Sequence, residues 1–365
     1  MAEEAHVSRT RPAARRVLLM FVSALVLFVG VAAPSPASAA DGPFCVPRTT
    51  QPGVGLTLVS VERIDARTQM YAFRSKAVGD AMPDGLVRVR VILPADYDRS
   101  PGRRYPVMLH LHGTNNSPST WPAGEVEQVL GDNDVIFVEP DGGPAGFYAD
   151  WYGTPVTGGD LFNGPVPFPP PAWETFHIRE LLPWLDKTFR TTGRRAITGS
   201  SMGGFGAMAY PARNPGVFVA AGSFSGAVDL DALYPISPVL ISLAWDPCIF
   251  GDRTLQADNW NAHNPVDLAA ELRGVSLFVA CGNGLPGRYD DAVSAVAGAP
   301  MEILVHQMAE NFVAALARAE VPVTTWFYGN GTHPGGTTAT RFYDYDDLRR
   351  FLPQAMSALN RKQPV

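Results

Sequence analysis

The sequence contains very little lysine. Only Lys76, Lys187 and Lys362 occur among 365 residues, and we attribute the preference for arginine to GC-rich coding rather than to function. Lys and Arg together number 29 against 35 Asp and Glu, which gives a formal net charge of −6. A basic surface that would bind nucleic acid is therefore not expected.

Cysteine is also scarce, with one residue each at Cys45, Cys248 and Cys281. The sequence has no C-x-x-C motif, no H-E-x-x-H motif and no histidine cluster, so we expect no metal and no cofactor. Cys281 ends an apolar run and is expected to be a buried thiol. If the chain is exported, the remaining cysteines, Cys45 and Cys248, are hypothesised to form a disulfide. The alternative is that all three cysteines are free thiols.

Only one stretch of the sequence is long and apolar enough to resemble a membrane segment. It covers Val17 to Ala33, follows a basic region that contains Arg15 and Arg16, and precedes Ala37-Ser38-Ala39-Ala40. This order of basic region, apolar run and small residues predicts a signal peptide over residues 1–40, cut after Ala39 or Ala40. The prediction implies a secreted or cell-wall-associated protein, with a retained membrane anchor as the alternative.

The motif that organises the chain is Gly199-Ser200-Ser201-Met202-Gly203, a Gly-x-Ser-x-Gly sequence. Apolar and β-branched residues precede it and a run of small residues follows, which predicts a strand, a sharp turn and a helix. This is the pattern of the nucleophile elbow of α/β-hydrolases, in which a strained serine lifts its hydroxyl above the sheet. The flanking glycines allow the outgoing helix to pass close to the strand.

Strands alternate with helices on both sides of this motif. Beyond residue 105 this alternation predicts an α/β protein whose mostly parallel central sheet is covered by helices on both faces. We expect a single α/β-hydrolase domain over residues 41–365, with a cap-like insertion at about residues 227–275. The expected strands cover residues 56–64, 69–75, 86–94, 106–113, 135–140, 218–226, 275–281 and 321–328, and the expected helices cover 173–189, 302–319 and 346–359.

A serine nucleophile needs a base, and the base needs an orienting carboxylate. Downstream of Ser201, only His333 lies in a loop directly after the last expected strand, where α/β-hydrolases carry the base. The residues leave the acid open between Glu302, at the start of a helix, and the pair Asp290 and Asp291, which follow the Cys281 strand.

Two backbone N–H groups are expected to stabilise an oxyanion, those of Met202 after the nucleophile and Thr114 after the 106–113 strand. His112, at the end of that strand, is interpreted as a structural residue. Loops at the carboxyl ends of parallel strands line the active site in this fold class, so Asp150 and Trp151 are expected to line the substrate site.

Several stretches resemble the antigen 85 mycolyltransferases and the wider esterase D-like family of esterases. They are Phe147-Tyr148-Ala149-Asp150-Trp151-Tyr152, Trp173-Glu174-Thr175-Phe176, Ser201-Met202-Gly203, Ala257-Asp258-Asn259-Trp260, Cys281-Gly282-Asn283-Gly284-Leu285-Pro286 and Asn330-Gly331-Thr332-His333. The resemblance implies Ser201 as nucleophile, His333 as base, Glu302 as acid and Thr114 and Met202 as oxyanion donors. It also places Asn115 and Trp260 among the substrate-lining residues.

The chain departs from the antigen 85 pattern where that branch binds sugar. Its Asp-Gly-Leu-Arg oxyanion loop is replaced by His112-Gly113-Thr114-Asn115, and its tryptophan two residues after the histidine is replaced by Gly335. We therefore expect a secreted serine-dependent acyl-ester enzyme that moves an acyl group from a substrate such as a glycolipid or an acylglycerol to a sugar or glycerol hydroxyl or to water. We do not expect the family's trehalose contacts. The alternatives are a plain secreted carboxylesterase and a noncatalytic carbohydrate-binding cell-wall protein.

Overall fold

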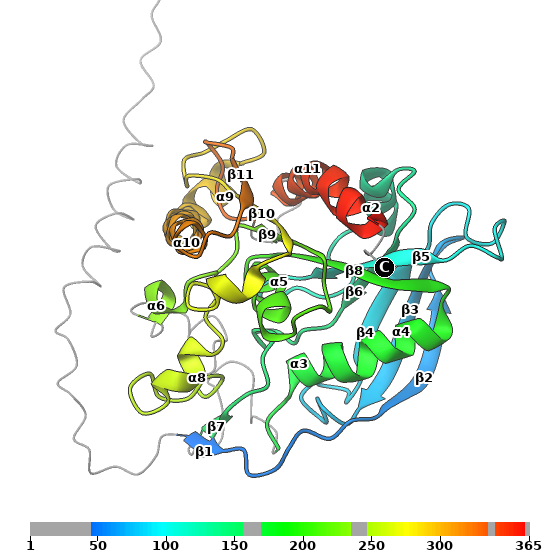
Figure 1. The fold of residues 1–365 in the computed structure, drawn as a ribbon, viewed down its shortest axis with the longest axis horizontal. Coiled ribbons are helices and arrows are strands. Elements are labelled where there is room, and N and C mark those ends of the chain that lie inside the picture. Colours follow the sequence, from blue (N-terminus) through cyan, green and yellow to red (C-terminus); the bar gives the residue numbers. More distant parts are fainter. Residues whose placement is uncertain (1–44, 156–168, 235–246, 335–339, 362–365) are drawn as a thin grey trace, which may run out of the picture. The chain divides into compact units, whose positions relative to one another are not determined.

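A nine-stranded sheet organises the chain in a computed structural model that describes residues 45–155, 169–234, 247–334 and 340–361 (Figure 1). The strand order across the sheet is β11-β10-β9-β8-β5-β6-β4-β3-β2. The strands are β2 (Leu56–Arg63), β3 (Thr68–Ser75), β4 (Val87–Ile92), β5 (Tyr105–Leu111), β6 (Ile136–Pro140), β8 (Thr191–Ser200), β9 (Ala220–Phe224), β10 (Ser276–Cys281) and β11 (Val323–Phe327).

The sheet has a parallel part and an antiparallel part. β11, β10, β9, β8, β5 and β6 are mutually parallel, whereas β4 pairs antiparallel with β6, β3 with β4 and β2 with β3. The parallel part is rich in buried apolar residues, as expected for strands covered on both faces. It brings the carboxyl ends of β5, β8, β9 and β10 to one edge, where the functional loops begin.

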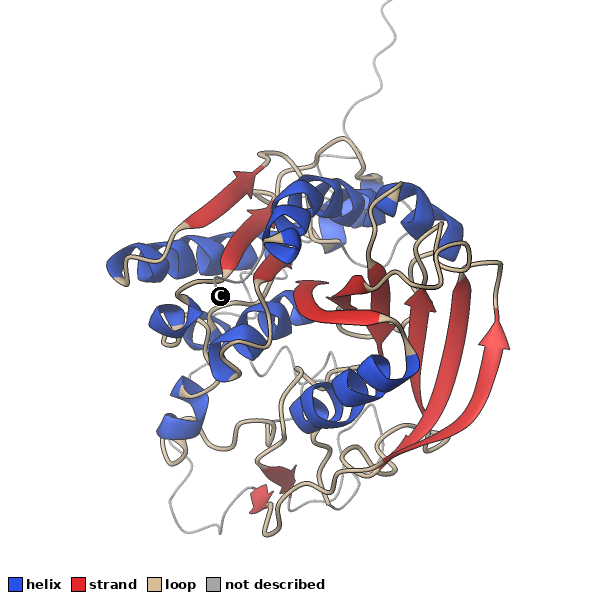
Figure 2. Ribbon diagram, turned by 45° about the vertical axis from the view of Figure 1, so that its right-hand side comes forward, coloured by secondary structure: helices blue, strands red, loops and turns tan. Residues whose placement is uncertain are grey.

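Helices cover both faces of the sheet (Figure 2). α2 and α11 belong to one apolar core, and α3, α4, α5 and α10 belong to the other, which confirms the predicted α/β-hydrolase architecture. The helices are α2 (Ala123–Leu130), α3 (Trp173–Thr175), the π-helical turn η1 (Phe176–Leu181), α4 (Leu182–Thr188), α5 (Met202–Arg213), α6 (Leu230–Leu233), α8 (Ala257–Asn261), the 3₁₀ turn η3 (Ala269–Leu272), α9 (Ala292–Ala297), α10 (Ala299–Arg318) and α11 (Arg341–Asn360).

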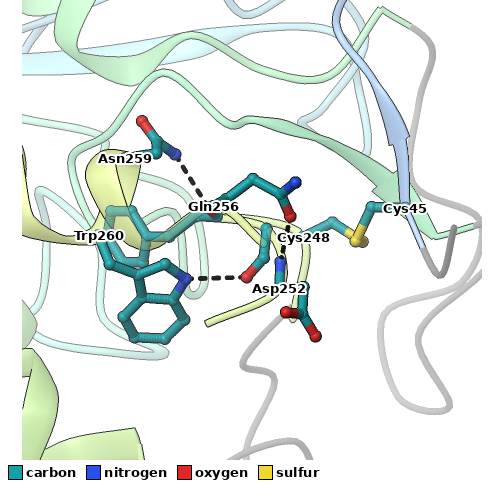
Figure 3. The surroundings of a disulfide bond; sticks show 8 residues. Cys45, Cys248, Asp252, Gln256, Asn259 and Trp260 are labelled. Atoms are coloured by element: carbon teal, nitrogen blue, oxygen red, sulfur yellow. Dashed lines mark hydrogen bonds between the residues drawn. A yellow bond between two sulfur atoms is a disulfide. The ribbon is translucent and has the colours of Figure 1, made fainter. Parts of the chain in front are cut away.

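A disulfide joins the start of the described chain to a segment near α8 (Figure 3). Cys45 lies on the short strand β1 (Cys45–Pro47), which pairs with β7 (Gly153–Pro155), and its sulfur is bonded to that of Cys248. The two Cα atoms are 5.7 Å apart. Cys281 is a buried free thiol, so the pairing hypothesised from the sequence is the one that the structure contains.

Some of the sequence predictions lie outside the described residues. They include the signal peptide over residues 1–40 and residues 235–246 of the cap-like insertion. Within the described ranges, no helix has both the length and the apolar character needed to cross a membrane.

Candidate active site

Ser201 occupies the turn between β8 and α5 in a strained backbone conformation. Its φ is 55° and its ψ is −118°, in a region that residues with a Cβ seldom adopt. The tight packing around the turn explains the flanking glycines, because a Cβ on Gly203 would overlap the carbonyl oxygen of Leu111 and a Cβ on Gly199 would overlap Gly203. The sharp turn predicted from the Gly-x-Ser-x-Gly sequence is therefore present.

Three side chains from separate elements form a continuous chain of hydrogen bonds at this turn. The Oγ atom of Ser201 lies 2.9 Å from Nε2 of His333, and Nδ1 of His333 lies 2.9 Å from Oε2 of Glu302. A carboxylate oxygen can only accept, so this arrangement places the ring proton on Nδ1 and leaves Nε2 to accept from the serine hydroxyl. It is the relation of nucleophile, base and orienting acid found in serine hydrolases.

Glu302 is fully buried in the first turn of α10 and is held by donors from two other loops. Its Oε1 atom accepts a hydrogen bond of 2.6 Å from the N–H of Gly282 and one of 2.8 Å from the hydroxyl of Ser225. Ser225 follows β9 with a φ of 43°. The sequence analysis did not identify Ser225 as a functional residue, although a polar residue at the carboxyl end of a central strand was a usable signal.

The other two candidate acids are occupied elsewhere. Asp290 accepts hydrogen bonds from the N–H of Thr332 at 3.1 Å, from the Thr332 hydroxyl and from the Tyr343 hydroxyl at 3.0 Å. Asp291 caps the start of α9. Asp290 thus holds Thr332, the residue directly before His333. The sequence did not reveal this supporting role of Asp290.

The loop after β5 lies against the nucleophile turn. A Cβ on Gly113 would be 3.4 Å from the Cβ of Ser201, so the next residue, Thr114, begins its loop beside the serine. Within the described chain, the N–H groups of Thr114 and Met202 donate no hydrogen bond to the protein. Met202 is the first residue of α5, where N–H groups have no partner within the helix.

His112 holds this loop in place. The N–H of Gly142 donates to its Nε2 at 2.9 Å, so its Nδ1 carries the proton and donates to the carbonyl of Gly113 at 2.8 Å. Burial lowers the pKa of His112 to about 4, which keeps the ring neutral. These contacts match the structural interpretation of this histidine.

The four residues expected to line the substrate site have different surroundings. Asn115 is exposed in the loop after β5, with a φ of 58°. The carboxylate of Asp150 accepts both the N–H and the hydroxyl of Thr175, at 2.9 and 2.6 Å, and the ring N–H of Trp151 donates to the carbonyl of Gly146.

Trp260 is the fourth of these residues, and it is only 3% exposed. Its ring N–H donates to the carbonyl of Gly251 at 2.9 Å (Figure 3). Among the described residues, none of Asp150, Trp151 and Trp260 lines the cavity beside Ser201. Through these hydrogen bonds Asp150 and Trp260 hold neighbouring loops in place.

No group of three or more His, Cys, Asp or Glu side chains in the described ranges is arranged to hold a metal ion. The arrangement instead provides a hydroxyl group next to an imidazole, with backbone N–H groups close by. Such a site can form and break a covalent bond to an acyl carbon without a cofactor.

The sheet order, the strained serine turn and the Ser201–His333–Glu302 contacts define an α/β-hydrolase. Comparison with known proteins agrees, since the model of the family described as "Putative esterase" matches residues 81–344. The chain belongs to this esterase family, whose members are enzymes of the α/β-hydrolase class, and the resemblance noted from the sequence is confirmed.

Individual relatives support the same assignment. Esterase Rv1288 of Mycobacterium tuberculosis is 35% identical over 254 residues, which are 66% of this chain and 52% of that protein. Diacylglycerol acyltransferase/mycolyltransferase Ag85B of Mycobacterium leprae is 34% identical over 160 residues, which are 41% of this chain and 45% of that protein. The chain thus spans about half the length of the curated relatives it matches.

A solved structure of Mycobacterium tuberculosis MPT51 (FbpC1) has the same fold. It superimposes with a TM-score of 0.55 at 21% identity and covers 75% of this chain and 94% of that chain.

Proposed function

We propose that this protein is an exported, serine-dependent acyl-ester enzyme. Ser201 attacks the ester carbonyl while His333 takes the hydroxyl proton and Glu302 holds the imidazole in the required orientation. The backbone N–H groups of Thr114 and Met202 stabilise the negatively charged oxygen of the tetrahedral intermediate. The observation that carries the proposal is the unbroken chain of hydrogen bonds from Ser201 to Glu302.

The reaction proceeds in two halves. In the first, His333 returns its proton to the leaving alcohol, the C–O bond breaks, and the acyl group stays on Ser201. In the second, a hydroxyl group gives its proton to His333 and attacks the acyl carbon, the bond from that carbon to Ser201 Oγ breaks, and His333 returns the proton to the serine oxygen. If the hydroxyl belongs to a sugar or a glycerol, the protein is an acyltransferase, and if it belongs to water, the protein is an esterase.

The similar proteins support both outcomes of the second half. One is named as an esterase and the other as a diacylglycerol acyltransferase/mycolyltransferase. We propose glycolipid or acylglycerol esters as the substrate class. The absence of the antigen 85 sugar-binding acid and arginine from the loop after β5 argues against trehalose as the particular acceptor.

Export is the second part of the proposal. The basic region, the apolar run and the small residues up to Ala40 support a signal peptide. The Cys45–Cys248 disulfide fits a protein that matures in an oxidising compartment. We therefore propose a secreted or cell-wall-associated location.

Product partition tests the proposed chemistry. Purified protein lacking residues 1–40 is given a short p-nitrophenyl ester with and without glycerol, glucose or trehalose, and the products are identified by mass spectrometry. Acylated glycerol or sugar, formed at the expense of free acid, would establish a transferase, and free acid alone would establish an esterase. Full ester turnover by Ser201→Ala would overturn the proposal, because no acyl-serine could form.

A further inference from the structure

A small cavity lies beside Ser201, bounded by α11. Its volume is about 20 Å³, and Ser200, Asp344 and His110 line it together with Ser201 and with Pro334, the residue after His333. The cavity thus lies next to the nucleophile and to the loop that carries the base. A space of this size holds about one water-sized group.

Three of the side chains that line this cavity carry buried polar atoms with unused hydrogen-bonding capacity. In the described part of the chain, no hydrogen bond of normal geometry reaches Nδ1 of His110, Oγ of Ser200 or Oδ1 of Asp344, although the Ser200 hydroxyl lies close enough to the Asp344 carboxyl to act on its pKa. These residues are 3%, 6% and 4% exposed, respectively. A buried polar atom left unpaired costs about 1–3 kcal/mol, so His110 Nδ1 and the unused capacity of the Ser200–Asp344 pair around one space indicate a hydrogen-bonding occupant.

The chemistry of these groups indicates a neutral occupant. Burial lowers the pKa of His110 to about 3, so its imidazole is uncharged. Burial also raises the pKa of Asp344 to about 8, which favours the protonated carboxyl at neutral pH. An imidazole, a hydroxyl and a carboxyl offer both donors and acceptors, and the group that uses both at this size is another hydroxyl.

We propose that Ser200, His110 and Asp344 form a subsite for one hydroxyl group next to the one that reacts. Water fills it in the free enzyme, and in transfer it holds the second hydroxyl of an acceptor that carries two hydroxyls on neighbouring carbons. This inference rests on the proposed acyl-enzyme mechanism and adds to it a preference for vicinal diols. The recognition comes from β5, β8 and α11, rather than from the loop that carries the sugar-binding residues in the antigen 85 branch.

The test compares acceptors that differ by one hydroxyl. The acyl-enzyme formed from a short p-nitrophenyl ester is offered 1,2-propanediol, 1,3-propanediol or 1-propanol at equal concentration, and transferred product is divided by free acid. The wild type should favour 1,2-propanediol over 1-propanol by about 10-fold per reacting hydroxyl, since one hydrogen-bonded hydroxyl contributes about a factor of ten. An equal ratio for all three alcohols would overturn the subsite.

Variants identify the residues responsible. Ser200→Ala and Asp344→Leu should each lower the diol preference by about 5-fold or more, whereas Asp344→Asn, which keeps the size and the neutral hydrogen-bonding groups, should retain most of it. The ratio is internal to each variant, so a general loss of activity does not change it. Ser223→Ala is the matched control, because Ser223 is also buried, finds no hydrogen-bond partner among the described residues and does not line this cavity.

A second measurement does not depend on activity. A crystal structure of the free protein should show a water within hydrogen-bond distance of Ser200 and Asp344, and a dry cavity would overturn the subsite. If Ser201→Ala retained full turnover, the acyl-enzyme mechanism would fail while the water site could still be observed. If the acyl-enzyme forms and no diol preference is seen, the subsite alone fails.

Discussion

Glu302 and Asp344 are two buried carboxyl groups close to Ser201, but their surroundings differ. Glu302 accepts hydrogen bonds from His333, Gly282 and Ser225, whereas Asp344 has an oxygen that no described group reaches. Burial, aided by the charge of Glu302, raises the pKa of Asp344 to about 8. The two buried acids therefore differ in their contacts. Glu302 accepts a hydrogen bond from the His333 ring, whereas Asp344 is favoured as a neutral carboxyl group.

The comparison shows that two equally buried carboxyl groups can differ in their hydrogen-bond donors, and that these donors determine how strongly each carboxylate is stabilised. Desolvation penalises the charged form of any buried acid, and hydrogen bonds from N–H and O–H groups offset that penalty. Replacing either acid, or removing one donor, therefore tests the contrast directly.

The substitution with the largest expected effect is Glu302→Gln, measured as the rate of p-nitrophenyl ester hydrolysis relative to the wild type. This change should lower kcat by a factor of about 10² or more, because an amide no longer fixes the imidazole in the required tautomer. Steady-state kinetics at neutral pH measure the effect. A decrease smaller than that caused by Asp290→Asn or Asp291→Asn would move the orienting role to the Asp pair.

The second prediction concerns the pH dependence of stability through Asp344. Burial raises its pKa in the folded protein to about 8 from an ordinary value of 3.8, so the folded state binds more protons than the unfolded state between these values and stability falls as pH rises. Asp344→Asn removes this loss, and its free energy of unfolding relative to the wild type should improve by about 4 kcal/mol between pH 5 and pH 8. Urea denaturation at both pH values measures it, and a difference that stays constant with pH would contradict a protonated Asp344.

The third prediction removes one donor from Glu302. Ser225→Ala deletes the hydroxyl that lies 2.8 Å from Oε1 and should lower kcat by about 10-fold with little change in KM. Cys281→Ser is not a suitable control because it alters a thiol close to Glu302. Ser223→Ala is the better control, because Ser223 lies on β9, the strand that Ser225 follows, and makes no contact with Glu302 in the described structure. An equal loss in both variants would mean that the Glu302 contact is not the cause.

The smallest expected effect is that of Asp290→Asn. An amide at this position cannot accept all of the hydrogen bonds from Thr332 and Tyr343, so the loop that carries His333 should become less ordered and kcat should fall about 5-fold. Asp291→Asn is a close match in chemistry, and it should mainly weaken the start of α9. Kinetics and thermal melting of both variants separate the two roles, and similar losses of kcat and melting temperature in both would point to general destabilisation.

The sequence predicted the parallel sheet and the strained serine because both depend on local patterns. Apolar runs marked the strands, and Gly199 and Gly203 marked the turn. The residues alone did not choose between Glu302 and Asp290, because the choice depends on donors from distant loops such as Gly282 and Ser225.

Other features were beyond the reach of local patterns. The three-residue strands β1 and β7 have too few residues to show an alternation, and α2 was not predicted. The last helix was expected to begin at Asp346, whereas α11 begins at Arg341 and so carries Asp344 to the cavity. The buried position of Trp260 depends on its contact with Gly251, which no spacing rule contains.

The covalent link between Cys45 and Cys248 also has a practical side. It closes a ring of chain across 203 positions, and in a chain-entropy treatment a link of that span contributes about 4–5 kcal/mol to stability. Material made in a reducing bacterial cytosol would carry the same Ser201, His333 and Glu302 without this closure. Disulfide-bonded and reduced preparations of the protein are therefore expected to have the same activity at low temperature but different lifetimes at 37 °C. The expression host must be the same in any comparison of activity.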